Sequence, residues 1–373
     1  MPAEPYDLVV VGAGPAGSSA ALFGARGGLR TLLLDRRNEL GQPVQCGEFL
    51  PTLQELCDLF PNHEGFEQVF QVPPTSVLQR TRTMVCIAPS GARYTFPVEG
   101  YSVSRRSFDK VLALRAEAAG AELRFPTSVV GVKEGGARVL LASGEEVTAR
   151  VVVAADGPLT EVGRAVGFSV QRQMYRMITA TSDVAFPDQL ELYFGSVAPG
   201  GYAWVIPKGA DANIGLGTTH LPRGETLSTL LNRFTKARGL PPPHHFTRWW
   251  VPLGPPPESA VRGNVLFAGD AANLVMATNG GGIPTAMISG MDAGRAAVAH
   301  VREGAPLGAY DRSWRDHMYL PLLRAWRMKQ GSDRFLRHDV LVSLGMRYLG
   351  AHGLDEMVRL RWPPRWPHRR EVA

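Results

Sequence analysis

The sequence predicts an α/β fold in which a Rossmann-like domain is assembled from separated segments, with a second, strand-rich domain inserted between them. Three observations predict it. Residues 6–35 show the pattern of a strand, a glycine turn, a helix and a strand; buried strands recur before the acidic motifs at 154–157 and 268–272; and residues 171–219 are rich in strands. A chain of 373 residues, 45% of them hydrophobic, can form one large core or two smaller ones that share an interface.

The first glycine turn has the features of a dinucleotide site. Gly12, Gly14 and Gly17 form the pattern G-x-G-x-x-G directly after the apolar strand DLVVV, and a small-residue helix follows. Such a turn lets backbone amides approach a pyrophosphate at the positive end of the helix. Asp35 ends the next strand, about twenty residues on, where an acid bonds a ribose hydroxyl. Together these features predict dinucleotide binding.

Two later motifs favour FAD over NAD. AADG at 154–157 and AGDAA at 268–272 each follow a buried β-branched strand. Asp270 would reach the ribityl or ribose hydroxyls of an extended cofactor. A helix beginning near Gly280, Gly281 and Gly282 would direct its amides at the pyrimidine edge of a flavin and stabilise the negative charge that reduction places there. We therefore predict noncovalent FAD in a glutathione-reductase-type domain.

The other elements fill the chain between these motifs. Helices are expected over 51–60, 221–239 and much of the chain from about 305, and a hairpin is expected to turn at Ser90 and Gly91. A helix over 104–120 ends at Gly120 and presents four apolar residues on or near one face: Phe108, Val111, Leu112 and Leu114. The proline-rich segment 241–257 is interpreted as a connector.

These elements define the predicted domains. The FAD-binding domain comprises 1–75, 100–170 and 260–304, the antiparallel-sheet substrate domain comprises 76–99 and 171–259, and a helical C-terminal region covers 305–373.

Composition limits the class of protein. Cys46, Cys57 and Cys86 are too few and too widely spaced for a disulfide framework or a zinc site, so we expect reduced thiols and no metal. We find no run of about 20 apolar residues and no signal peptide, and therefore expect a cytoplasmic protein. The net charge is +6, with arginines concentrated in the last seventy or so residues. Basic residues that are simply exposed to solvent explain this charge. A basic face that binds anionic lipid or a phosphorylated substrate would explain it as well. No nucleic-acid partner is expected.

Several motifs resemble one flavoprotein group. DLVVVGAGPAG, SRRSFD, ADGPLTEVGRAVG and GDAA are similar to motifs shared by aromatic hydroxylases, flavin-dependent halogenases and geranylgeranyl reductases. GGYAWVIPKGADANIGLG at 200–217, NGGGIPTAMISGMDAG at 279–294 and VQCGE around Cys46 most resemble the geranylgeranyl reductase family. The resemblance covers roughly residues 5–300, as expected for a common cofactor fold.

This resemblance assigns roles to individual residues. Arg105 would meet the phosphates or the hydroxyls on the isoalloxazine side of FAD. Asp156 is assigned to the cofactor, although a cap at the end of its strand explains it as well. The full set of expected cofactor residues is Gly12, Gly14, Pro15, Ala16, Gly17, Asp35, Arg36, Cys46, Gly47, Arg105, Asp156, Gly157, Gly269, Asp270, Gly280, Gly281, Gly282 and Ile283.

The substrate and catalytic residues follow from the same resemblance. Tyr202 and Trp204 alternate along a strand, so both rings face one side, and with Pro207 they would line an apolar slot. Cys46 lies in the loop that this family places against the flavin, where its thiol would donate a proton or gate the site. Glu48 is the second candidate proton source, and a small buried side chain is the alternative for Cys46.

The expected function is an FAD-dependent reductase that transfers hydride to C=C bonds of a geranylgeranyl or other isoprenoid chain. The electron donor is NADPH or a ferredoxin-like protein, and the oligomeric state is left open. A peripheral membrane contact would suit the basic, tryptophan-containing end RLRWPPRWPHRR.

Two other functions stay open at this point. One is a monooxygenase acting on a small aromatic compound, and the other is a flavoprotein that passes electrons to a quinone. Halogenation is disfavoured because the first lysine of the chain is Lys110, whereas that chemistry needs a lysine in the early cofactor domain.

Overall fold

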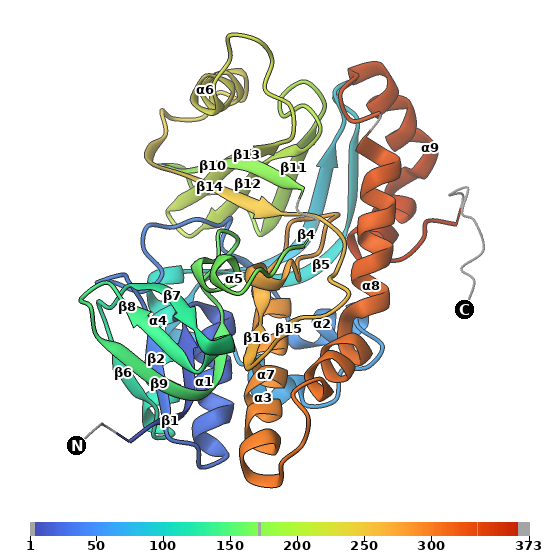
Figure 1. Cartoon of the computed structure of the whole chain (residues 1–373). Coiled ribbons are helices and arrows are strands. Elements are labelled where there is room, and N and C mark those ends of the chain that lie inside the picture. The colour runs from blue at the N-terminus through green and yellow to red at the C-terminus, as the bar shows by residue number, and fades with distance from the viewer. Residues whose placement is uncertain (1–3, 171–172, 334, 365–373) are drawn as a thin grey trace.

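The computed structural model describes residues 4–170, 173–333 and 335–364 as two eight-stranded sheets with helices around them (Figure 1). We call the sheet that contains the N-terminal strand the first sheet and the other the second sheet. In Figure 1 the first sheet lies at the lower left, the second sheet lies above it, and the last two helices run along the right side. The predicted α/β class is confirmed.

The first sheet is the Rossmann-like part of the protein. Its strands are β1 (Tyr6–Val11), β2 (Thr31–Leu34), β6 (Glu122–Arg124), β7 (Val129–Lys133), β8 (Arg138–Leu141), β9 (Glu146–Ala154), β15 (Val261–Arg262) and β16 (Val265–Phe267). The order is β15-β16-β9-β1-β2-β6, with β7 and β8 attached beside β9. The strands from β16 to β6 are parallel, and β1 and β2 are almost entirely buried, as expected for strands covered on both faces.

Helices α1 (Pro15–Arg26) and α7 (Ile283–Glu303) pack closely against each other beside this sheet. Glycines on α7 permit the approach, since a Cβ on Gly290 would lie only 2.1 Å from the carbonyl oxygen of Ala16. Helix α4 (Arg105–Ala118) buries Phe108 and Leu112, as predicted. Leu114 is 44% exposed, so its predicted place on that face is wrong, because two residues from Leu112 turn a helix by about 200°.

Shorter elements complete this region. They are α2 (Leu53–Leu59), α3 (Phe66–Val69), α5 (Glu161–Ala165) and the 3₁₀ turns η1 (Pro74–Ser76), η2 (Glu134–Gly136) and η3 (Gly269–Ala272).

The second sheet lies beside the predicted cofactor region. Its strands are β3 (Phe49–Pro51), β4 (Val77–Ile87), β5 (Arg93–Val103), β10 (Met174–Ser182), β11 (Gln189–Phe194), β12 (Tyr202–Lys208), β13 (Asp211–Thr218) and β14 (His244–Pro252). The order is β14-β10-β13-β12-β11-β4-β5-β3, antiparallel except where β4 meets β11. Helix α6 (Leu227–Ala237) covers one face of it. β3 and the last residues of β5 lie outside the segments predicted for the substrate domain.

The proline-rich connector contains an unpredicted strand. β14 pairs with β10 as an edge strand, and the prolines flank most of it. An edge position suits this sequence, since proline cannot donate to a neighbouring strand. The segment 241–257, interpreted from the sequence as a connector of unclear structure, therefore contains an edge strand.

The C-terminal region is helical, as predicted. It consists of α8 (Ala309–Asp333) and α9 (Asp339–Val358), which is interrupted at Gly350, where φ is 64°. Val342 and Met346 of α9 pack on the face of the second sheet that α6 leaves open. Among the described residues, no helix is both long and apolar enough to cross a bilayer. Of the basic end RLRWPPRWPHRR, residues 359–370, residues 359–364 are described and residues 365–370 lie outside the described residues.

Candidate active site

A cavity of about 1210 Å³ lies between the first sheet, the second sheet and the C-terminal helices. It has a polar part and an apolar part that are continuous with each other. The polar part is lined by Gly12, Gly14, Pro15, Ala16, Asp35, Arg36, Arg105, Asp156, Gly157 and Asp270. The apolar part is lined by Met84, Cys86, Met177, Leu192, Tyr202, Trp204, Ile206, Val342, Met346, Leu349 and Leu354.

The polar part is formed where neighbouring parallel strands end. The residues after β1, β2, β9 and β16 all line it, because these four strands are adjacent and their carboxyl ends meet at one edge of the sheet. Such an edge is where α/β sheets bind nucleotides.

Two glycines of the first turn, Gly14 and Gly17, have different roles. A Cβ on Gly17 would lie 1.7 Å from the carbonyl oxygen of Gly12, so Gly17 allows the helix to pack on the turn and does not line the cavity. Among the described residues, no atom would lie within 4 Å of a Cβ on Gly14 and no side chain caps the N-terminus of α1, so Gly14 leaves open space before that helix. That space and the helix terminus suit a pyrophosphate.

Asp35 orders this turn. Its carboxylate accepts hydrogen bonds from the backbone N–H of Ala13 and of Arg37, both at 2.8 Å, and it is 4% exposed. The acid therefore holds the glycine turn while still lining the cavity, where a ribose would lie.

Asp156 caps a helix with one carboxylate oxygen and leaves the other without a partner among the described residues. Its Oδ2 caps α5 by accepting from the backbone N–H of Glu161 at 2.8 Å and of Val162 at 3.3 Å. Its Oδ1 is buried and has no hydrogen-bond partner among the described residues. Burial raises the pKa of this carboxyl. A buried acceptor without a partner needs a donor, and a cofactor hydroxyl would supply one.

The N-terminus of α7 faces the same cavity. Gly280, Gly281, Gly282 and Ile283 line it, and within the described parts of the chain no side chain caps the helix. Gly280 has a φ of 69°, which favours glycine. Gly269 does not line the cavity. A Cβ added there would lie 3.1 Å from the Cβ atoms of Ala16 and Ala286, so Gly269 allows close packing.

The apolar part places alternate residues of β12 on the cavity side. Tyr202, Trp204 and Ile206 line it, and the centroids of the Tyr202 and Trp204 rings are 6.0 Å apart. Pro207 has the opposite parity and does not line the cavity, so its expected contact with substrate is wrong. The hydroxyl of Tyr202 donates to the backbone carbonyl of Asn279. Burial raises the pKa of the Tyr202 hydroxyl.

Cys46 lies where the two parts meet. Its thiol interacts electrostatically with Arg105 on the polar side and with Tyr202 on the apolar side. Burial raises the pKa of the Cys46 thiol, while the positive charge of Arg105 opposes that rise. The thiol therefore carries its proton near neutral pH and lies beside a cation that favours the thiolate once the proton leaves.

Arg105 is already engaged by a protein carboxylate. Its guanidinium donates to both oxygens of Asp109, at 2.8 and 2.7 Å, and both side chains are largely buried. It lines the cavity with the rest of its surface. Arg106, by contrast, is an exposed residue paired with Glu39, as expected for an ordinary surface charge.

Glu48 is held by several donors. It forms an ion pair with Lys208, accepts from the side-chain amide of Asn213 at 3.2 Å and from the backbone N–H of Arg105 at 3.1 Å, and is 2% exposed. These contacts engage both carboxylate oxygens of Glu48 and fix the position of its side chain.

Asn213, which was not predicted from the sequence, joins the Cys46 loop to the apolar part. Its amide donates to the carbonyl of Cys46 at 3.0 Å, and its oxygen accepts from the indole N–H of Trp204 at 2.8 Å. A polar residue between the buried residues Ala212 and Ile214 was the available signal. Lys208, the ion-pair partner of Glu48, was missed as well.

A cofactor cradle opening into an apolar channel is the arrangement of an FAD-dependent oxidoreductase. The chain belongs to the FAD binding domain family, which matches residues 5–315. Within that class it belongs to the geranylgeranyl reductase family. The digeranylgeranylglycerophospholipid reductase of Methanocaldococcus jannaschii is 32% identical over 337 residues, covering 84% of this chain and 83% of that protein. Reductase 1 of that name from Methanothermobacter thermautotrophicus is 33% identical over 339 residues, with the same coverage.

Solved structures resemble this chain as well. A geranylgeranyl bacteriochlorophyll reductase-like protein from Thermoplasma acidophilum matches with a TM-score of 0.81 and 29% identity, covering 91% of this chain and 90% of that one. A flavin-dependent brominase matches with a TM-score of 0.69 and 19% identity over 96% and 93% of the two chains, which shows a shared fold. The predictions of family, enzyme class and FAD are confirmed.

Proposed function

We propose that this protein reduces C=C bonds in a geranylgeranyl or related isoprenoid chain of a lipid. The observation that carries the proposal is the continuity of the apolar channel with the FAD cradle, with a protonated thiol where they meet. Relatives that align with most of the chain are named digeranylgeranylglycerophospholipid reductases. An isoprenoid chain offers no groups for hydrogen bonding, which suits a channel lined by methionine, leucine and aromatic side chains.

The residues around the cradle fit FAD. The N-terminus of α1 and the space at Gly14 would hold the pyrophosphate, Asp35 would bind a ribose, and Asp156 Oδ1 would accept from a hydroxyl. The N-terminus of α7 would face the pyrimidine edge. Reduced FAD supplies a hydride, and the protein supplies position and exclusion of water.

Cys46 is proposed as the proton donor. The hydride adds to one carbon of the double bond, and the thiol proton adds to the other, which leaves a saturated C–C bond and a thiolate. Arg105 stabilises that thiolate, and a proton from water restores the thiol. Glu48 acts as a positioning residue, since its carboxylate holds Lys208, Asn213 and the backbone of Arg105 around the Cys46 loop.

We also propose an electron donor and a cellular location. NADPH or a ferredoxin-like protein would supply electrons, and the enzyme would work in the cytoplasm with a peripheral contact to the membrane that contains its substrate.

The proposal is tested by anaerobic half-reactions. The FAD-loaded protein is reduced without oxygen and mixed with a geranylgeranyl lipid while the flavin spectrum is followed. We expect the oxidised spectrum to return and mass spectrometry to detect a product heavier by two hydrogens per reduced bond. A flavin that stays reduced until air is admitted, followed by hydroxylation of an aromatic compound, contradicts the proposal. Anaerobic reoxidation by a quinone with no saturated lipid product also contradicts it.

Variants at two cysteines test the proton donor. Cys46→Ala should slow lipid reduction while the reduced flavin still forms, whereas Cys57→Ala, a matched control away from the channel, should leave the rate unchanged. A normal rate in Cys46→Ala removes Cys46 from the chemistry.

A further inference from the structure

Exposed apolar side chains gather at the start of α9. Of the twelve large hydrophobic side chains exposed in the described parts of the chain, five lie within residues 335–348. Val340, Leu344 and Tyr348 are spaced by four residues and therefore share one side of the helix, with exposures of 71%, 57% and 56%. Phe335 and Leu341 adjoin them. We call these five residues the α9 face.

The other side of the helix is apolar too. Val342 and Met346 are buried against the second sheet, with exposures of 4% and 5%. A helix that is hydrophobic all round is normally buried on all sides. The α9 face therefore needs an apolar partner, because contiguous apolar patches on a surface mark contact sites.

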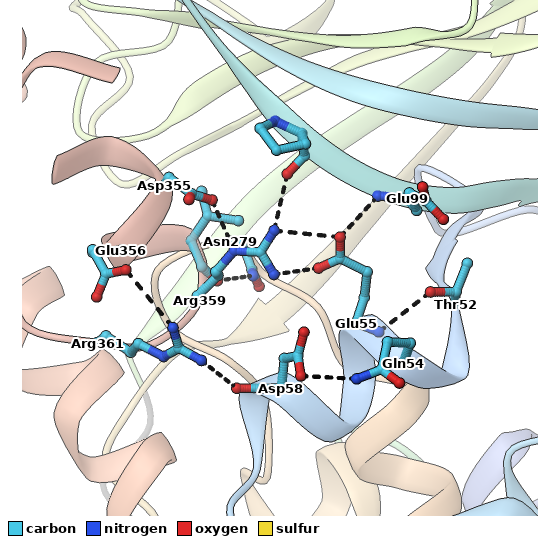
Figure 2. Close-up of polar contacts among 12 residues, drawn as sticks. Thr52, Gln54, Glu55, Asp58, Glu99, Asn279, Asp355, Glu356, Arg359 and Arg361 are labelled. Atoms are coloured by element: carbon cyan, nitrogen blue, oxygen red, sulfur yellow. Dashed lines mark hydrogen bonds and ion pairs between the residues drawn. The ribbon is translucent and has the colours of Figure 1, made fainter. Parts of the chain in front are cut away.

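Polar contacts fix both ends of α9 in this position. At its start, Asp339 accepts from the backbone N–H and the hydroxyl of Ser196, at 2.6 and 2.7 Å. Just after its end, Arg359 pairs with Glu55 of α2 and with Asp355 (Figure 2). The helix is thus held with its apolar face outward.

The exposed charged side chains within residues 335–352 are basic. They are Arg337 and Arg347, and the exposed His338 and His352 add positive charge when they are protonated. Asp339 is the only acid in that stretch of the sequence, and it is bound to Ser196. Basic residues around an apolar surface match the anionic headgroups and apolar interior of a membrane leaflet. A protein partner recognised by its apolar surface alone does not account for this charge.

The α9 face also surrounds an entrance to the active-site cavity. Phe335, Leu341, Leu344 and Tyr348 are exposed and line the cavity at the same time. The channel therefore opens on this face, and a bilayer lying against it would meet the opening directly.

We propose that the α9 face docks on an anionic membrane surface and admits the lipid chain from the bilayer to the channel. The proposal rests on the proposed function for the identity of the lipid. It places the membrane contact on α9, whereas the sequence alone predicted that contact at the basic end RLRWPPRWPHRR. The helix lies in the interface and leaves the rest of the protein in water.

The test uses FAD-loaded protein and sedimentation with vesicles of phosphatidylcholine and phosphatidylglycerol. The variant Val340→Glu/Arg347→Glu changes two exposed residues of the start of α9 that do not line the cavity. The control Val130→Glu/Arg223→Glu makes the same charge change at exposed positions elsewhere. We expect the wild type and the control to bind alike and the α9 variant to bind at least tenfold more weakly. Equal binding by the two variants, or no binding by the wild type, overturns the proposal.

Catalysis separates this proposal from the proposed function. Lipid embedded in vesicles should be reduced at least tenfold more slowly by the α9 variant, while lipid dispersed in detergent should be reduced at the wild-type rate. If neither form of the lipid is reduced by any protein, the proposed function fails, and the sedimentation result still decides the docking. If light scattering shows a wild-type dimer that the α9 variant converts to a monomer without vesicles present, the face binds a second copy and the docking proposal is wrong.

Discussion

Asn213→Leu tests whether one buried amide holds the Cys46 loop against the substrate strand. Leucine has a similar volume, so the change removes hydrogen bonds and leaves little empty space. The indole N–H of Trp204, which is 6% exposed, would lose its acceptor at 2.8 Å, and Glu48 would lose a donor at 3.2 Å. A buried unsatisfied donor costs about 1–3 kcal/mol and a lost bond to a charged group about 1.5–3 kcal/mol, so we expect a loss of about 2.5–6 kcal/mol in the free energy of unfolding.

Urea unfolding of the FAD-loaded protein, followed by tryptophan fluorescence, measures this loss. The control is Asn232→Leu on the exposed side of α6, where a change within about 0.5 kcal/mol is expected. A loss for Asn213→Leu that is no larger than that of the control would refute the reasoning. Such a result would mean that water or a shifted loop satisfies Trp204 and Glu48.

Three further predictions concern the cofactor and the thiol. Asp156→Ala should weaken FAD binding about tenfold to a hundredfold in a fluorescence titration, because Oδ1 is the buried acceptor that FAD would satisfy; an unchanged Kd would contradict this. Gly17→Ala should prevent correct folding and abolish FAD binding, since its Cβ would lie 1.7 Å from a backbone oxygen, whereas Gly14→Ala should fold and bind FAD more weakly; circular dichroism and bound flavin distinguish them, and folded, FAD-loaded Gly17→Ala would be inconsistent with the turn described. The rate of lipid reduction should stay level through neutral pH and fall only in alkaline solution, because burial raises the Cys46 pKa and the protonated thiol is the donor; a stopped-flow profile that falls near pH 7 would exclude this role.

Local patterns made the cofactor site predictable. The turn around Gly12 and the acid at Asp35 follow from rules that act within one strand, turn and helix, so short-range sequence reports them. The shared side of Tyr202 and Trp204 follows from the two-residue period of a strand. The same period, applied strictly, excludes Pro207, which was included by resemblance to a motif alone.

Contacts between distant segments were beyond sequence reasoning. Asn213 meets Cys46 across 167 positions, and no local period reports such a pair. The strand β14 exists because β10 offers it an edge, which a proline-rich sequence does not announce. The α9 face was missed because the C-terminal region was judged by its charge, although Val340, Leu344 and Tyr348 repeat at helical spacing.

Asn279 touches both halves of the molecule. Its carbonyl accepts from Tyr202, and its side-chain amide donates to the carbonyl of Val358 at the end of α9, at 3.4 Å. The loop that carries it leads into the glycines at the N-terminus of α7. If FAD orders this loop from the cofactor side, it also orders the wall of the channel, and the two binding equilibria are then thermodynamically linked. In that case the factor by which FAD raises affinity for the lipid would equal, by reciprocity, the factor by which the lipid raises affinity for FAD.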